Sequence, residues 1–82
     1  MADFHYVYTL ASDSDPSRYY TGIATDLDDR LAGHNRGNVR AAAAHAPWRI
    51  ETFTAFQCPK KAAAFERYLK SRSGRAFAAK HF

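Results

Sequence analysis

A carboxylate stands at an apolar position of a predicted helix. Glu66 falls within the stripe formed by Ala62, Phe65 and Leu69, where a bare charge must be paired, protonated or bound to a metal. The alternative interpretation is that Glu66 leans outward and pairs with Lys70 four residues later, for a few tenths of a kcal/mol. Without other context, the ion pair is the simpler expectation.

Four further side chains could take part in proton transfer or anion binding. Arg30 and His34 lie four residues apart beside the apolar stripe of another predicted helix, and Tyr8 and Tyr20 fall in two predicted strands. Each also has an ordinary interpretation, because Arg30 and His34 could form a solvated helix edge and the tyrosines could be half-buried sheet residues. No glycine-rich phosphate loop is present, and the remaining histidines show no metal-site spacing.

Two strands and a turn must position these tyrosines. Residues 4–10 and 18–24 are rich in aromatic and β-branched types, and the polar residues between them predict a hairpin. If the hairpin is symmetric about Ser14, Tyr8 lies opposite Tyr20 and Tyr6 lies opposite Gly22, so both tyrosines share one face.

A helix follows the second strand and carries Arg30 and His34. Thr25 and Asp28 resemble a capping box, which predicts a helix from about Asp26, and Asn35 with Gly37 predicts its end. Residues 36–47 form either a mobile basic loop or a loop with one Ala-rich helical turn. Residues 48–56 then predict a third strand, whose inward residues are Trp48, Ile50 and Phe56.

The C-terminal part reads as two helices. Pro59 suits the first turn of a helix over residues 59–70, Ser73-Gly74 predicts a break, and residues 75–82 predict a short closing helix. The element order β-β-α-β-α-α predicts an α/β (α+β) domain over residues 1–82, with a three-stranded, mainly antiparallel sheet flanked by helices.

Composition limits the class of protein. The 82 residues suffice for one domain, and 46% hydrophobic content favours a packed fold. A single cysteine excludes an internal disulfide, and neither a leader nor a membrane span is predicted, so we expect a reduced, cytoplasmic protein that could associate with the nucleoid. The net charge is −5 over residues 1–29 and +9 over residues 30–82, which is suggestive of a polyanion binder.

Taken together, the residues resemble the GIY-YIG endonuclease family, in particular its small single-domain members. The resemblance rests on the stretches 6–8 (Tyr-Val-Tyr) and 20–22 (Tyr-Thr-Gly), followed in family order by Arg30, His34 and Glu66. It covers nearly the whole chain.

Two departures from the family pattern stand out. Tyr6 replaces the first glycine and Thr21 the isoleucine of the two name-giving triplets, and no asparagine follows Glu66. Ser71, Ser73 or water would take the role of that asparagine.

The resemblance implies a metal-dependent hydrolase of phosphodiester bonds in DNA, with RNA as the alternative substrate, that selects structure rather than sequence and acts in DNA repair. Glu66 would hold Mg²⁺ or Mn²⁺, and Arg30 would face the phosphate. Tyr8 would act as general base, Tyr20 would position water or phosphate, and His34 would relay a proton or donate to the phosphate.

The same resemblance assigns the other basic residues to the nucleic acid backbone. A binding module without catalysis and a nuclease that needs a protein partner remain the alternative interpretations. The residues expected to contact phosphates are Arg36, Arg40, Lys60, Lys61, Arg72, Arg75 and Lys80.

Overall fold

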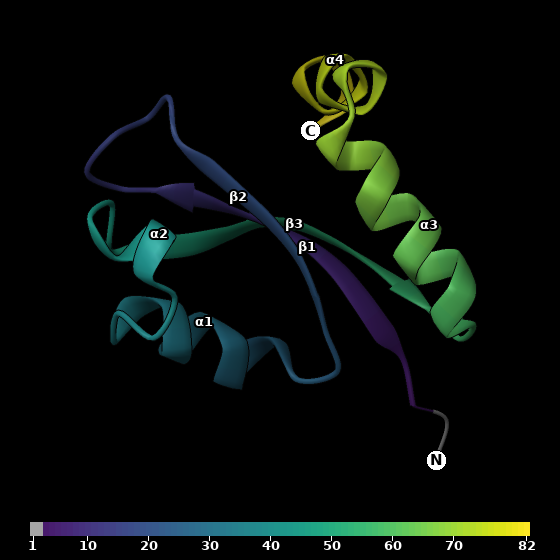
Figure 1. Cartoon of the computed structure of the whole chain (residues 1–82), viewed down its shortest axis with the longest axis horizontal. Helices are drawn as coiled ribbons and strands as arrows, with labels where there is room; N and C mark the ends of the chain where they lie inside the picture. The colour runs from purple at the N-terminus through teal and green to yellow at the C-terminus, as the bar shows by residue number, and fades with distance from the viewer. Residues whose placement is uncertain (1–2) are drawn as a thin grey trace.

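The computed structural model describes residues 3–82. The prediction that the N-terminal segment is not a leader therefore falls partly on residues 1 and 2, which lie outside the described residues. Figure 1 shows the elements in the predicted order, and the Ala-rich segment holds one helical turn, which was one of the two alternatives for residues 36–47. No helix within the described residues is long and apolar enough to cross a membrane. The elements are β1 (His5–Ser12), β2 (Tyr19–Ala24), α1 (Leu27–Asn35), α2 (Arg40–Ala43), β3 (Trp48–Phe56), α3 (Pro59–Lys70) and α4 (Arg72–His81).

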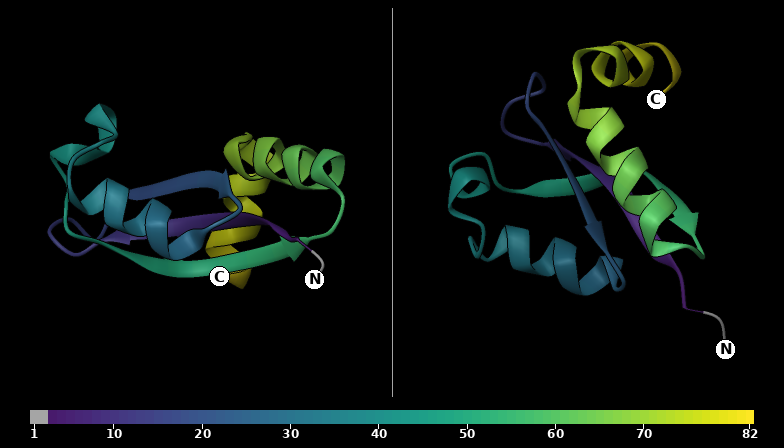
Figure 2. Two further views of the ribbon diagram at one scale, coloured as in Figure 1. Left: turned by 90° about the horizontal axis from the view of Figure 1, so that it is seen from below. Right: turned by 45° about the vertical axis from the view of Figure 1, so that its right-hand side comes forward.

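The three strands form an antiparallel sheet in the order β2-β1-β3. The central strand, β1, is the most deeply buried, and its alternate side chains point to opposite faces. Figures 1 and 2 show α1 and α2 on one side of the strands and α3 and α4 on the other. The fold class predicted from sequence is therefore confirmed.

Each face of the sheet has its own apolar cluster. On the α1 side Tyr8, Leu10 and Trp48 are buried together, and on the α3 side Val7 packs with Ala62 and Leu69. The alternation of β1 sends neighbouring residues to different clusters. The β2 edge of the sheet lies between α1 and α3 (Figure 1). Side chains from the two sides of the sheet can therefore approach one another at this edge.

The hairpin register differs from the predicted one. Tyr8 pairs with Gly22 and Leu10 pairs with Tyr20, so the hairpin is centred on Asp15 rather than Ser14. The turn closes through hydrogen bonds from the amide of Ser12 to the carbonyl of Arg18 (3.1 Å) and from the Arg18 amide to the Asp15 carbonyl (3.0 Å). Because the resulting shift is two residues, it preserves the faces.

A β-bulge in β3 changes the face of the sheet on which its alternate side chains lie. Thr9 pairs with Thr52 and Leu10 with Ile50, which leaves Glu51 as the extra residue. Trp48 and Ile50 therefore face the α1 side, whereas Phe56 packs in the α3-side cluster. All three are at least partly buried, as predicted, but the sequence pattern did not reveal that they serve different faces.

The first helix begins one residue later than its predicted cap implied. Asp26 is the N-cap and its carboxylate accepts a hydrogen bond from the Asp29 amide at 3.0 Å, so the predicted Thr25–Asp28 capping box is wrong. Asp26 has extended backbone angles and is itself a strong N-cap residue. The predicted end is confirmed, since the helix stops at Asn35 and Gly37 has a positive φ of 81°.

The boundary between the last two helices lies at Ser71, not at Ser73-Gly74. The Ser71 hydroxyl accepts from the Gly74 amide at 3.1 Å, and α4 begins at Arg72. A Cβ on Gly74 would lie 1.7 Å from the Tyr68 carbonyl oxygen. The glycine therefore permits the close corner between α3 and α4 instead of breaking the chain.

Candidate active site

The phenol of Tyr8 reaches the β2 edge over a glycine. Tyr8 is 1% exposed, and a Cβ on its cross-strand partner Gly22 would lie 2.4 Å from the phenolic oxygen. A side chain at position 22 would therefore displace the ring. An isolated glycine inside a predicted strand often marks a close approach of this kind, and this was the sequence signal for it.

His34 holds the hydroxyl of Tyr8 from α1. The His34 side chain is fully buried and its Nε2 lies 3.3 Å from the Tyr8 hydroxyl oxygen. Tyr20 packs edge-on against the imidazole, with 4.4 Å between ring centroids, and stacks on Tyr8 at 6.4 Å. These three residues are called here the tyrosine–histidine cluster. The shared face of the two tyrosines was predicted from sequence, whereas the contact of both with His34 of α1 was not.

Burial and charge set the protonation of this cluster. Burial, reinforced by the Arg30 guanidinium, lowers the pKa of His34, so the imidazole is neutral at pH 7. Burial also raises the pKa of Tyr8, against the lowering effect of Arg30, with Tyr20 and Glu66 adding to the rise. Tyr8 is therefore a neutral phenol beside a neutral imidazole.

The tautomer of His34 decides the direction of their hydrogen bond. If Nε2 lacks a proton, it accepts from the Tyr8 hydroxyl, and the proton on Nδ1 faces no acceptor among residues 3–82. In the other tautomer, Nε2 donates to Tyr8. The first arrangement leaves Nε2 ready to receive a proton from the phenol.

Glu66 approaches from the opposite side of the sheet. Its Oε2 lies 2.9 Å from Nζ of Lys70, so the ion pair that the simpler interpretation expected is present. The Glu66 side chain is nevertheless only 19% exposed, and its charge contributes to the raised pKa of Tyr8. The carboxylate thus takes part in the ion pair and is also felt by the tyrosine–histidine cluster.

The donor set fits a metal that takes few protein ligands. Within the described chain, no three His, Cys, Asp or Glu side chains gather to form a metal cage. Mg²⁺ is commonly held by one or two carboxylates, with waters and substrate phosphates as its other ligands. The Glu66 carboxylate offers the hard oxygen donors that such an ion takes.

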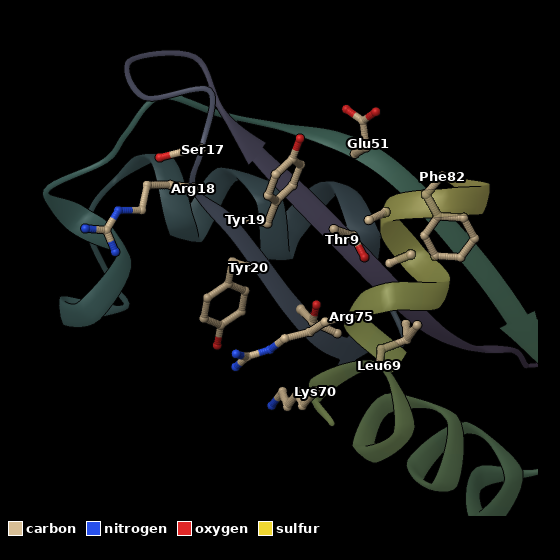
Figure 3. Close-up of a pocket in the computed structure, with 13 residues that line it drawn as sticks. Thr9, Ser17, Arg18, Tyr19, Tyr20, Glu51, Leu69, Lys70, Arg75 and Phe82 are labelled. Carbon is tan, nitrogen blue, oxygen red and sulfur yellow. The ribbon is translucent and has the colours of Figure 1, made fainter. Parts of the chain in front are cut away.

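Two hollows adjoin these residues. The smaller, of about 220 Å³, lies at the C-terminal part of α1 and is lined by Asp29, Arg30, Gly33, His34, Arg36, Asn38 and Val39. The larger, of about 800 Å³, lies between the sheet and α4. Figure 3 shows Tyr20, Lys70 and Arg75 together at one end of the larger cavity and Tyr19, Thr9 and Phe82 farther along it.

The basic residues assigned to the nucleic acid backbone do not form one group. Arg36 lines the small hollow together with Arg30, and Arg75 lines the large cavity together with Tyr20. The other members are exposed and line neither hollow. These are Arg40, Lys60, Lys61, Arg72 and Lys80.

Three contacts near the site were not expected from sequence. Asn35 clamps the start of β3, because its side chain accepts from the Trp48 amide at 2.6 Å and donates to the Trp48 carbonyl at 3.1 Å. The hydroxyl of Ser71 donates to the Tyr68 carbonyl, besides capping α4, so it is already engaged. Lys70 lines the large cavity, although the sequence suggested only its pairing with Glu66.

Comparison with known proteins identifies the family. The model of the GIY-YIG catalytic domain matches residues 4–80. Among solved structures, the chain is similar to the UPF0213 protein BH0048 from Bacillus halodurans, determined by solution NMR, at 29% identity and a TM-score of 0.56; the match covers 94% of this chain and 83% of that one. No curated protein sequence matches. A catalytic-domain match over nearly the whole chain shows that this protein belongs to the GIY-YIG family, whose catalytic domain is of the nuclease type.

Proposed function

We propose that this chain is a metal-dependent endonuclease that hydrolyses phosphodiester bonds in DNA and selects its substrate by structure. The observation that carries the proposal is the contact between the Tyr8 hydroxyl and neutral His34, beside Arg30 and within the field of Glu66. Together, a buried phenol, an imidazole, a guanidinium and a carboxylate can supply the proton transfer, charge stabilisation and metal binding that phosphodiester hydrolysis uses. Such a nuclease would act on DNA intermediates of repair.

Tyr8 and His34 would move the proton of the attacking water. A phenol with a raised pKa is a weak general base by itself, so its own proton must leave as it takes one from water. The Nε2 atom of neutral His34, 3.3 Å away, is the available acceptor. Because the pKa of His34 is lowered, the imidazole would return this proton readily after the reaction.

The other residues would bind and orient the phosphate. Arg30 would present its guanidinium to the scissile phosphate, where negative charge develops in the transition state. Tyr20, fixed by its edge-on contact with His34, would position water or a phosphate oxygen.

Glu66 would hold a Mg²⁺ or Mn²⁺ ion, which supplies positive charge to the scissile phosphate and the leaving oxygen. The ammonium group of Lys70 already neutralises the Glu66 carboxylate, so a bound metal ion would either displace this ammonium group or share the carboxylate with it.

The test compares Glu66→Gln with Glu51→Gln, which removes a carboxylate from β3 outside the site. Each protein is incubated with plain duplex, branched and flapped DNA, and with RNA, in Mg²⁺, in Mn²⁺ and in chelator. We expect metal-dependent cutting of branched or flapped DNA, about 10²-fold or more slower for Glu66→Gln and unchanged for Glu51→Gln. Circular dichroism spectra establish that both variants are folded.

Two outcomes would replace this proposal. Tight, salt-dependent DNA binding without cutting in any metal would favour a binding module. Cutting that appears only after a co-purified protein is added back would favour a partner-dependent nuclease. Cutting that persists in chelator or in Glu66→Gln would contradict the role of Glu66.

A further inference from the structure

The small hollow at the end of α1 gathers donors for an anion. Arg30, Arg36 and Asn38 all line it. Asp29 is its one acidic residue and His34 is neutral, so its net charge is +1.

The helix end builds this hollow. The amide of Asn38 donates to the Gly33 carbonyl at 3.0 Å and that of Gly37 donates to the His34 carbonyl at 3.1 Å, the pattern of a Schellman motif. The positive φ of Gly37 turns the chain back over Gly33. A Cβ on Gly33 would lie 3.5 Å from the Asn38 amide nitrogen and 4.0 Å from a guanidinium nitrogen of Arg36, so both donors lie over this bare position.

These two donors have no protein partner. Among residues 3–82, neither the guanidinium of Arg36 nor the side-chain amide of Asn38 makes a hydrogen bond or ion pair. An arginine fork and an amide N–H group that converge without an acceptor match the oxygens of a phosphate.

The larger cavity also holds basic residues, but among those of the described chain that line it only Arg75 is unpaired. Arg18 is paired with Asp15 at 3.5 Å and Lys70 with Glu66 at 2.9 Å, and the Glu51 carboxylate pairs with Arg49 at 3.7 Å. Its charges are therefore mostly neutralised within the protein. Two unpaired donors that lie over one bare position, rather than volume, distinguish the small hollow.

We propose that the hollow formed by Arg36, Asn38 and Gly33 is a second phosphate site, which holds the phosphate next to the scissile one on the cut strand. This rests on the proposed function, because Arg30 lines the same hollow and would face the scissile phosphate. The cut strand would then run along α1 toward its C-terminal end. Two fixed phosphates define which bond of the strand reaches Tyr8.

The first experiment needs no catalysis. Inorganic phosphate is titrated into the metal-free protein and followed by amide NMR. Saturable shifts are expected at the backbone amides of Gly33, Arg36 and Asn38, with binding several-fold weaker in Arg36→Gln. Arg67→Gln, which removes the same charge from an exposed position of α3, should bind as the wild type does. Uniform small shifts across the protein, or equal binding by Arg36→Gln, would overturn the site.

The second experiment places the site on the substrate. A single neutral methylphosphonate replaces the phosphate on either side of the scissile one in a DNA that the protein cuts. At one of the two positions, the methylphosphonate should slow cutting about tenfold for the wild type and for Arg67→Gln, relative to unmodified DNA. For Arg36→Gln, which has already lost the contact, the same replacement should slow cutting little. Equal losses in all three proteins would contradict the assignment. If no DNA is cut at all, the proposed function fails, whereas the phosphate titration still decides the site.

Gly33→Ala offers a variant that tests the hollow without removing charge. Its methyl group would meet Asn38 and Arg36 at ordinary contact distances, so folding should be preserved while the floor of the hollow is filled. Weaker phosphate binding by this variant, with unchanged fold, is expected; wild-type binding would argue against the location.

Discussion

The two sides of the sheet use burial differently. On the α1 side the buried set includes a phenol and an imidazole in contact, Tyr8 and His34, beside unpaired donors at the helix end. On the α3 side the buried cluster is apolar, and most charges around the large cavity are paired. Under the proposed function, the α1 side would carry the proton transfer and phosphate binding, and the α3 side would hold the sheet in shape and supply Glu66.

Tyr8→Phe should give the largest effect, a loss of DNA cutting with little change in stability. Removing only the hydroxyl should slow single-turnover DNA cutting by about 10²–10⁴-fold, because the proton path from water to His34 is lost. The free energy of unfolding should fall by only about 1 kcal/mol, the usual net value of one hydrogen bond.

Tyr6→Phe is the matched control, since Tyr6 lies on the same face and packs edge-on against the exposed ring of Phe53. It should cut DNA at the wild-type rate. Equal rates for the wild type and Tyr8→Phe would remove the functional contrast between the two sides.

Gly74→Ala should show the opposite behaviour. The methyl group would overlap the Tyr68 carbonyl, so α3 and α4 must separate, and we expect unfolding to become easier by about 3 kcal/mol or more in denaturant titrations. Cutting per folded molecule should change little. Gly33→Ala is the control within α1, where no clash exists and up to about 1 kcal/mol of stabilisation is expected. Similar stabilities for the two variants would contradict the close corner.

Gly22→Ala should affect both properties, because position 22 lies under the Tyr8 phenol. We expect a loss of about 1–3 kcal/mol in the free energy of unfolding and slower cutting, since the hydroxyl must move away from the edge. The two effects are measured by thermal melting and single-turnover assays. A stable Gly22→Ala protein with wild-type cutting would show that Tyr8 does not depend on this approach.

The smallest expected effect is a loss of folding stability at low pH, caused by the burial of neutral His34. Its pKa is lowered in the folded protein, so the unfolded chain binds the proton first as the pH falls below about 6.5. Stability should be fully present above that pH and decline progressively below it, down to the lowered pKa of the folded state. Melting temperatures between pH 8 and pH 5 measure this.

His34→Gln should lose that part of the decline, and His81→Gln, at the exposed end of α4, should retain it. A decline that is identical in all three proteins would show that His34 is not buried in neutral form.

Local signals in the sequence were sufficient for most of the fold. Strand-forming residues, Pro59 in a first helical turn and Gly37 at a helix end predicted the elements and their order, because these preferences act within a few residues. The errors concern competing local options. Asp26 replaced Thr25 as cap, and Gly74 proved to be a point of close packing rather than a break.

The sequence by itself determined the fold class, the family and the residue types of the candidate site, since these follow from local propensities and an ordered motif. The tertiary structure decided what lies next to what. The hairpin centre at Asp15, the bulge at Glu51 and the passage of Tyr8 over Gly22 depend on pairing between distant segments. So do the neutral imidazole of His34 and the two unpaired donors over Gly33, because burial and charge arise only when strands and helices meet.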